Sequence, residues 1–347
     1  MVESTCTAAP STGLRHRVAD HAASGAMRDL LEHHRLSYAP EPLSEGAVFG
    51  LSGALDLRVR MVANGVPAID LEGRAPSLET DLCSHLGISA ELVTTDDAQA
   101  GWQALQAELD AGHPTLVRAD LRALEYREDE RHDTRHAIVV SGYDSDAGVA
   151  CVADHGFAEQ QRCSLAALAS ARASQWGAEP VRHAMLALRP RRRLADPRDA
   201  TAAALRRVIG SMRAGGGIPA FPNVHSGLEG IDALARGWSL LPEMAGPQLG
   251  ETLAAMRIRI GGSGSGGALY RSLQARFLHE AAALLGAPQL GRGALICDDL
   301  ADAWRALAGA IAERDAQLAH RVAGPWVRRV QMLEHRHVEA LEAHIAG

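Results

Sequence analysis

The segment Asp20-His21-Ala22-Ala23-Ser24-Gly25-Ala26-Met27-Arg28-Asp29-Leu30-Leu31 sets the plan of the first half of the chain. It is typical of a short polar turn that opens into an amphipathic helix, because its apolar residues recur at spacings of three and four. The unpaired backbone N–H groups at such a helix start can activate a thiolate and hold an oxyanion. Thiolate chemistry would need a cysteine at position 22, where the chain has alanine.

Composition and charge are those of an ordinary globular protein. The 347 residues are 47% hydrophobic and 22% charged, which is long enough for two domains. A net charge of −7 argues against a general nucleic-acid binder, which must neutralise phosphates. No signal core and no apolar run of about 18 residues occurs, so a cytoplasmic protein without a membrane span is expected.

The five cysteines are scattered along the chain without a Cys-x-x-Cys spacing. They are Cys6, Cys83, Cys151, Cys163 and Cys297. This usage argues against a disulfide framework or a structural zinc site, and it favours a reducing cytosol. None of Cys6, Cys83 and Cys151 is expected to open a helix, so none is a candidate nucleophile.

The first part of the chain, residues 13–189, shows the mixed periodicity of an α+β domain. Helical spacing predicts helices over residues 20–34, 77–86, 98–111 and 164–172. Alternating and β-branched runs predict strands over residues 57–62, 88–94, 115–119, 136–144, 149–153 and 183–188. The strands 136–144 and 149–153 should form a hairpin, whereas the glycines of residues 49–55 predict a turn region.

Residues 190–199 contain an arginine run between two prolines and are expected to be a linker. Beyond them, residues 200–347 are predicted to form a mostly helical domain. Its expected helices are residues 200–212, 227–238, 268–285, 298–317 and 326–345. The chain is therefore expected to carry two domains in series.

His136 and Asp154 are candidates for an acid–base pair. His136 opens one strand of the expected hairpin and Asp154 ends the other. Residues that face one another across a ladder lie about 5 Å apart, which suits a general base and the carboxylate that orients it. A surface histidine and an ordinary strand-ending aspartate would explain the same residues without function.

Two further segments match known sequence motifs, but their surroundings do not support the functions of those motifs. His132-Asp133-Thr134-Arg135-His136 imitates a zinc metallopeptidase motif, which needs a helix to bring both imidazoles to one face. Here the second histidine begins a β-rich run. Gly262-x-Gly264-x-x-Gly267 matches a dinucleotide fingerprint, but no βαβ units surround it, so a glycine loop before a helix is expected.

Taken in order, these features resemble papain-like cysteine enzymes, in particular the double-glycine leader peptidases and, more closely, the family of the butirosin-biosynthesis protein H. The similar segments of the first domain are Asp20 to His34, Val48-Phe49-Gly50-Leu51-Ser52-Gly53, His136 to Asp144, and Asp154. The family has a second domain of otherwise unknown function. The similar segments there are Gly227 to Leu234, Gly261 to Gly267, Tyr270, and Phe277 to Ala282.

The resemblance implies an amide-forming acyltransferase of natural-product biosynthesis. A cysteine thiolate would take an acyl group from the phosphopantetheine thioester of an acyl or peptidyl carrier protein and pass it to a small amine. His136 would be the base and Asp154 would hold its tautomer, while the helix start at His21, Ala23 and Ser24 would receive the oxyanion. The protein would need no metal and no cofactor of its own, since the phosphopantetheine belongs to the carrier.

The glycine loop has a role under the same hypothesis. The N–H groups of Gly264, Ser265 and Gly266 could hold the phosphate of the pantetheine arm. The long terminal helices are compatible with a homodimer.

Ala22 is the departure from the family pattern, because a methyl group cannot attack a carbonyl. Either the alanine is an engineered knock-out or the chain is a natural member that lost covalent catalysis. The presence of both His136 and Asp154 favours the first explanation. Two other functions stay open on the same scaffold: a leader-type cysteine peptidase, and a non-catalytic protein that binds a thioester or peptide.

Overall fold

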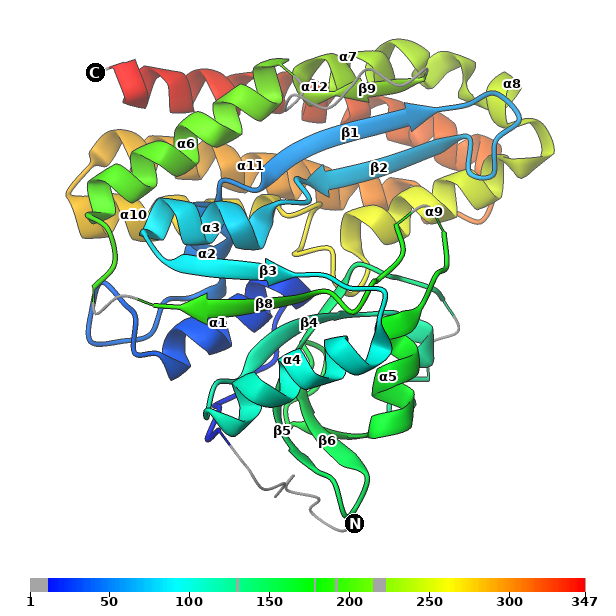
Figure 1. Ribbon diagram of the computed structural model, residues 1–347. Helices are drawn as coiled ribbons and strands as arrows, with labels where there is room; N and C mark the ends of the chain where they lie inside the picture. The colour runs from blue at the N-terminus through cyan, green and yellow to red at the C-terminus, as the bar shows by residue number, and fades with distance from the viewer. Residues whose placement is uncertain (1–11, 129–130, 178, 191–192, 215–222, 347) are drawn as a thin grey trace. The chain divides into compact units, whose positions relative to one another are not determined.

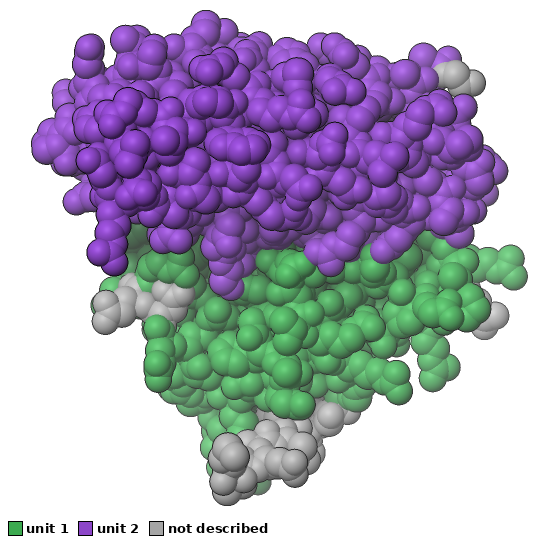
Figure 2. Space-filling view, turned by 180° about the vertical axis from the view of Figure 1, so that it is seen from behind, with its two compact units in different colours: residues 1–45, 87–194 green, residues 46–86, 195–347 purple. Residues whose placement is uncertain are grey.

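The computed structural model describes residues 12–128, 131–177, 179–190, 193–214 and 223–346, and the chain forms two compact units (Figures 1 and 2). The first unit contains residues 1–45 and 87–194, and the second contains residues 46–86 and 195–347. The expected division into residues 13–189 and 200–347 differs from these units, because residues 46–86 pack with the C-terminal half. Cys6 and residues 191–192 of the expected linker lie outside the described residues.

The described part of the first unit is built on a six-stranded antiparallel sheet with the order β3-β8-β4-β5-β6-β7. These strands are β3 (Ser89–Val93), β4 (Thr115–Ala119), β5 (His136–Asp144), β6 (Val149–Ala153), β7 (Gln161–Ser164) and β8 (Met185–Arg189). The predicted hairpin of β5 and β6 is confirmed, and β7 was not predicted. The fold class is α+β, as the sequence indicated.

Three α-helices pack on this sheet, and all three were predicted to within a few residues. They are α1 (Ala22–His33), α4 (Ala98–Asp110) and α5 (Leu165–Ala173), with a short 3-10 turn, η1 (Leu121–Ala123). Leu105 and Leu109 of α4 join Ile138 and Val140 of β5 in a fully buried core. Helix α1 packs against β5 and β4, so residues 22–33 lie beside the strand that carries His136.

The second unit combines a small antiparallel sheet with many helices. The described strands have the order β2-β1-β9, and their bounds are β1 (Leu55–Met61), β2 (Ile69–Arg74) and β9 (Val224–Ser226). The helices are α2 (Glu45–Ser52), α3 (Leu78–Leu86), α6 (Pro197–Ala214), α7 (Gly227–Gly237), α8 (Leu241–Ala245), α9 (Leu249–Gly261), α10 (Arg271–Leu285), α11 (Pro288–Ala310) and α12 (Ala316–Ala346), with two 3-10 turns, η3 (Trp238–Leu240) and η4 (Gly246–Gln248). Among the described helices, none has the length and apolar character needed to cross a membrane.

The predicted turn at residues 49–55 is wrong, because most of it belongs to α2. Its glycines serve close helix packing rather than a turn. A side chain at Gly46 would meet Arg276 of α10, and one at Gly50 would lie within 2.3 Å of the Phe277 ring. Only glycine lets the two helices approach this closely.

The glycine loop before α10 has an unusual left-handed backbone. Residues 256–260 lie in helix α9, so the strand that a dinucleotide fingerprint requires is not present there. Gly266 and Gly267 have positive φ angles, and so do the three following residues, Ala268 (50°), Leu269 (52°) and Tyr270 (71°). This run delays the start of α10 to Arg271, three residues later than predicted.

Two other helices of the second unit also differ from prediction. Helix α11 starts at Pro288 and ends at Ala310, about ten residues before the expected start and seven before the expected end. Helix α12 starts at Ala316 and continues through Pro325, where the sequence predicted a helix beginning only after that proline. Pro288 stands in the first turn of α11, where proline is favoured, whereas Pro325 lies inside α12.

A buried ion pair anchors this end of the loop to the helices. Arg271 Nε donates to Glu334 Oε1 at 2.9 Å, and both side chains are fully buried. Trp304 Nε1 donates to the same carboxylate oxygen at 2.9 Å. Arg271 Nη1 also donates to the carbonyl oxygen of Leu269 at 2.7 Å, which fixes the left-handed segment.

Candidate active site

Helix α1 begins with a network of buried polar groups. His21 is the N-cap residue, and its Nδ1 accepts the backbone N–H of Ser24 at 3.3 Å. Glu45 accepts the backbone N–H groups of Asp20 and His21, each at 2.9 Å, and the Ser24 hydroxyl at 2.9 Å. Ser24 is therefore not the capping residue that the sequence suggested: its buried N–H group is itself capped by His21, and its hydroxyl donates to Glu45.

Ala22 is the first residue of the helix, and Ala23 is the second. Both are buried, with exposed fractions of 9% and 1%. Their backbone N–H groups have no hydrogen-bond partner in the part of the chain that the structure describes. Of the helix-start residues that the sequence singled out, these two retain the donors that an oxyanion would need.

The structure brings His136 and Asp154 together. His136 Nε2 lies 3.0 Å from Asp154 Oδ1, and both side chains are buried. The strand register pairs Val139 with Ala153, so the two residues do not face one another directly across the ladder. The contact forms instead because Asp154 lies just past the end of β6. The bond uses Nε2, so Nδ1 is the nitrogen with which His136 can take up a proton.

The Asp154 carboxylate has four donors, three of which the sequence did not indicate. Oδ1 contacts His136 Nε2 and His155 Nδ1, each at 3.0 Å. Oδ2 accepts Arg127 Nη1 at 2.6 Å and the Tyr126 hydroxyl at 3.0 Å. Burial would raise the pKa of the Asp154 carboxyl, but the hydrogen bonds from His136 and His155 and the charge of Arg127 hold this pKa well below its usual range. Asp154 is thus a permanent anion.

A third histidine, His16, connects the segment before α1 to this site. His16 Nδ1 lies 2.6 Å from Asp29 Oδ2 of α1, and His16 Nε2 lies 3.2 Å from the Asp154 carbonyl oxygen and 3.0 Å from that of Phe157. Arg28 supports Asp29 with two bonds, at 2.9 and 2.8 Å. His16 is invisible to sequence reasoning because its partners are 13 to 141 residues away.

The cluster also offers ligand atoms for a metal. One atom each from His136, Asp154 and His155 lie within 4.8 Å of one another. The positive charge of Arg127 on the same carboxylate disfavours a cation, and the two histidine nitrogens each already contact Asp154 Oδ1. The two histidines of the segment from His132 to His136 also have different partners. His132 Nδ1 contacts Asp120 Oδ2 at 2.7 Å, whereas His136 contacts Asp154. These contacts favour an acid–base cluster over a metal centre.

No cysteine of the described residues replaces the missing nucleophile. Burial raises the pKa of the Cys83 and Cys163 thiols to about 12, and it raises that of Cys297 well above its usual value. Cys151 is disulfide-bonded and offers no thiol, whereas the sequence argued against a disulfide framework.

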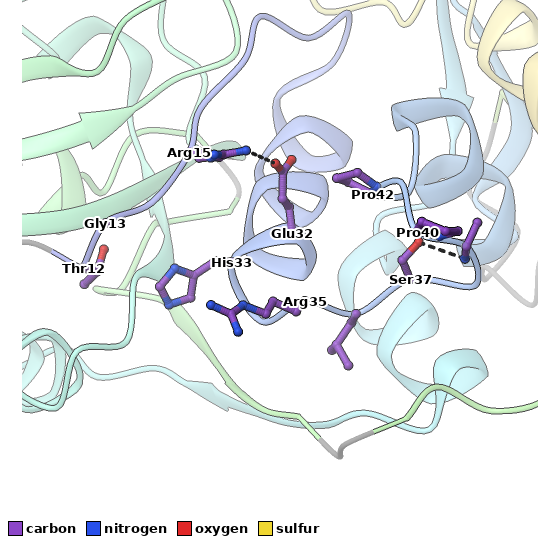
Figure 3. A pocket seen from close by; sticks show the side chains of 11 residues that line it. Thr12, Gly13, Arg15, Glu32, His33, Arg35, Ser37, Pro40 and Pro42 are labelled. Atoms are coloured by element: carbon purple, nitrogen blue, oxygen red, sulfur yellow. Dashed lines mark hydrogen bonds and ion pairs between the residues drawn. The ribbon is translucent and has the colours of Figure 1, made fainter.

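A cavity of about 670 Å³ lies at the opposite end of α1 from Ala22 (Figure 3). The exposed Arg15 side chain approaches Glu32 across it at 4.0 Å. Its lining comes from the first unit: Thr12, Gly13, Arg15, Glu32, His33, Arg35, Leu36, Ser37, Ala39, Pro40 and Pro42. The cavity does not include the acid–base cluster, and the sequence did not indicate it.

The remaining candidate residues, Gly264, Ser265 and Gly266, lie in the left-handed loop of the second unit. Ser265 is 7% exposed, and its N–H group donates to the Gly262 carbonyl oxygen at 3.1 Å. The N–H group of Gly266 has no partner among the described residues.

An α+β unit with a buried histidine–aspartate pair and a helix start is the arrangement of papain-like cysteine enzymes. Residues 21–155 match the family described as Butirosin biosynthesis protein H, N-terminal, and residues 166–341 match a Domain of unknown function (DUF4872). The chain belongs to this butirosin biosynthesis protein H family, with its N-terminal domain followed by its C-terminal domain. No curated protein gave a match. Membership implies an acyltransferase-like function in natural-product biosynthesis.

Proposed function

We propose that the site serves amide formation, with an acyl thioester on a carrier protein as donor and a small amine as acceptor. The observation that carries this proposal is the buried contact between His136 Nε2 and Asp154 Oδ1 at 3.0 Å. It provides a base whose tautomer is fixed by a permanent anion, in a chain of an acyltransferase-like family.

Position 22 is the place of the family's nucleophile in this proposal. A cysteine thiolate there would attack the thioester carbonyl, the carrier's thiolate would leave, and the amine would then displace the enzyme thiolate. His136 would take the proton first from the thiol and then from the amine. The N–H groups of Ala22 and Ala23 would stabilise each oxyanion. With alanine at position 22, introduced or natural, the chain cannot form the acyl-enzyme.

Ala22→Cys should therefore restore covalent chemistry. The expected result is a mass increase equal to one acyl group after incubation with an acyl-carrier thioester, together with iodoacetamide labelling at that residue. Intact-protein and peptide mass spectrometry measure both. Ala98→Cys is the matched control, because Ala98 is likewise the first residue of a capped helix, α4, but is exposed.

Other outcomes of this experiment separate the alternatives. Ala22 itself favours a second candidate, a non-catalytic protein that binds a thioester or peptide in the vacated site. Binding of the acyl-carrier without any acyl-enzyme in the Ala22→Cys chain would support that candidate and overturn ours. Cleavage of a precursor peptide by that variant would instead indicate the leader-type peptidase.

We also propose that the left-handed loop binds the phosphate of the carrier's pantetheine. Successive backbone N–H groups in a turn can form a concave anion site. Those of Gly266 and Gly267, which lie in a turn, have no partner among the described residues. Ser265→Asp should weaken carrier binding about tenfold or more by charge repulsion. Isothermal titration with the carrier measures this. Ser239→Asp, on an exposed residue of the same unit, controls for added charge, and equal affinity of both variants would contradict the role of the loop.

A further inference from the structure

Two histidines share a single oxygen of the Asp154 carboxylate. His136 Nε2 and His155 Nδ1 each lie 3.0 Å from Oδ1, and the two rings are 5.4 Å apart with an angle of 57° between them. An oxygen with two donors holds each of them less tightly than an oxygen with one. His155 therefore competes with His136 for the negative charge of Asp154, which orients His136 and stabilises its protonated form.

We infer that His155 is a positioning residue that limits how strongly Asp154 holds a proton on His136. The inference rests on the proposed function, in which His136 must take up a proton in one step and release it in the next. A base that is held too firmly as an imidazolium would take the proton but return it slowly to the leaving thiolate. Sharing Oδ1 keeps both steps accessible.

The surroundings of His155 leave it one polar contact within the described chain that involves its ring. Its Nδ1 lies 3.0 Å from Asp154 Oδ1, whereas its Nε2 is buried and has no hydrogen-bond partner among the described residues. His155 therefore contacts the cluster through Nδ1 alone.

The other charged or titratable groups around the cluster come from three segments: residues 126–127, the segment before α1, and α1 itself. Arg127 and Tyr126 contact Oδ2 of Asp154, and His16 contacts the Asp154 backbone, with Asp29 behind it. None of these groups contacts Oδ1. Among the described residues, His155 is thus the one that competes with His136 at its own oxygen.

His155 is also fixed relative to the helix that carries position 22. Its carbonyl oxygen accepts the N–H of Ala19 at 2.9 Å. Its Cβ lies 3.8 Å from the place of a side chain at Gly25, on the first turns of α1. The residue therefore contacts both parts of the site, the acid–base pair and the segment of the nucleophile.

The test compares His155→Gln with His155→Asn in the Ala22→Cys chain. An asparagine amide can occupy the place of Nδ1 and keep the bond to Oδ1, whereas a glutamine amide extends to the place of Nε2. The probe is iodoacetamide, and the readout is the pH midpoint of alkylation at position 22. We expect the glutamine variant to shift this midpoint down by on the order of half a pH unit, because Oδ1 is left to His136 and the thiolate–imidazolium pair gains stability. The asparagine variant should keep the parent midpoint.

Every other result overturns the inference. Equal midpoints for both variants would show that His155 does not act through Oδ1, and an upward shift toward a free thiol would show a merely structural role. His155→Leu provides a second donor-free variant, and circular dichroism checks that each chain is folded. The proposed function fails differently, since the Ala22→Cys parent would then alkylate no faster than the Ala98→Cys control.

Discussion

His136→Ala in the Ala22→Cys chain should lose acyl transfer to the introduced thiol by about 10²- to 10⁴-fold, the usual contribution of a general base. In the proposed function, His136 is the general base. Its Nε2 lies 3.0 Å from Asp154 Oδ1, so its second nitrogen can accept the proton of a thiol. Without the imidazole, the thiol at position 22 would have to ionise without a base. Stopped-flow or quenched measurements of acyl-enzyme formation check this.

The control for this loss is His113→Ala, which removes a half-exposed histidine paired with Glu108 in the same unit. It should leave the rate within about twofold, as expected for a surface pair. A His136→Ala chain that acylates as fast as its parent would place the base elsewhere and would remove the main support for the proposed function.

Glu334→Gln should destabilise the second unit by about 3–5 kcal/mol, the usual cost of breaking a buried ion pair. Glutamine keeps the shape of the side chain but leaves the Arg271 guanidinium uncompensated, although both groups are fully buried. The Trp304 N–H would also lose a charged acceptor. Urea unfolding followed by the tryptophan signal gives the change in the free energy of unfolding.

Two further variants separate charge from packing. Glu229→Gln alters an exposed ion pair with Arg236 and should change the free energy of unfolding by at most about 1 kcal/mol. The double variant Arg271→Met with Glu334→Leu removes both charges and should be more stable than Glu334→Gln alone. A double variant less stable than the single one would show that the ion pair is needed for its geometry and not only for its charge balance.

The sequence predicted those parts of the fold that depend on interactions between residues close together in the chain. The helix that starts at Ala22 and the β5–β6 hairpin follow from apolar spacing and a turn within about 20 residues, and both are confirmed. The contact of His136 with Asp154 was also predicted, although the strand register shows that it forms beyond the end of the ladder.

Contacts between distant residues explain what the sequence did not show. The glycines of α2 were taken for a turn because their partner, α10, lies more than 200 residues further along the chain. Glu45 and Arg127 belong to the site only through the fold, since nothing in their own segments marks them. His155 is the exception, because it stands directly beside Asp154 in the sequence and could have been considered.

Residues 46–86 belong to the second unit although the residues on both sides of them belong to the first, and this has a consequence for folding during translation. These residues leave the ribosome before β9, α6 and α10, on which β1, α3 and α2 pack. Until then, Gly46 and Gly50 lack the helix that fits against them, and one edge of β1 is unpaired. A chain cut between the two family matches, at residues 155–166, would make this condition permanent in the N-terminal fragment. The C-terminal fragment would keep β9 but lack β1 and β2, the other two strands of the described sheet. The two family regions are thus successive in sequence but fold as interdependent parts of one chain.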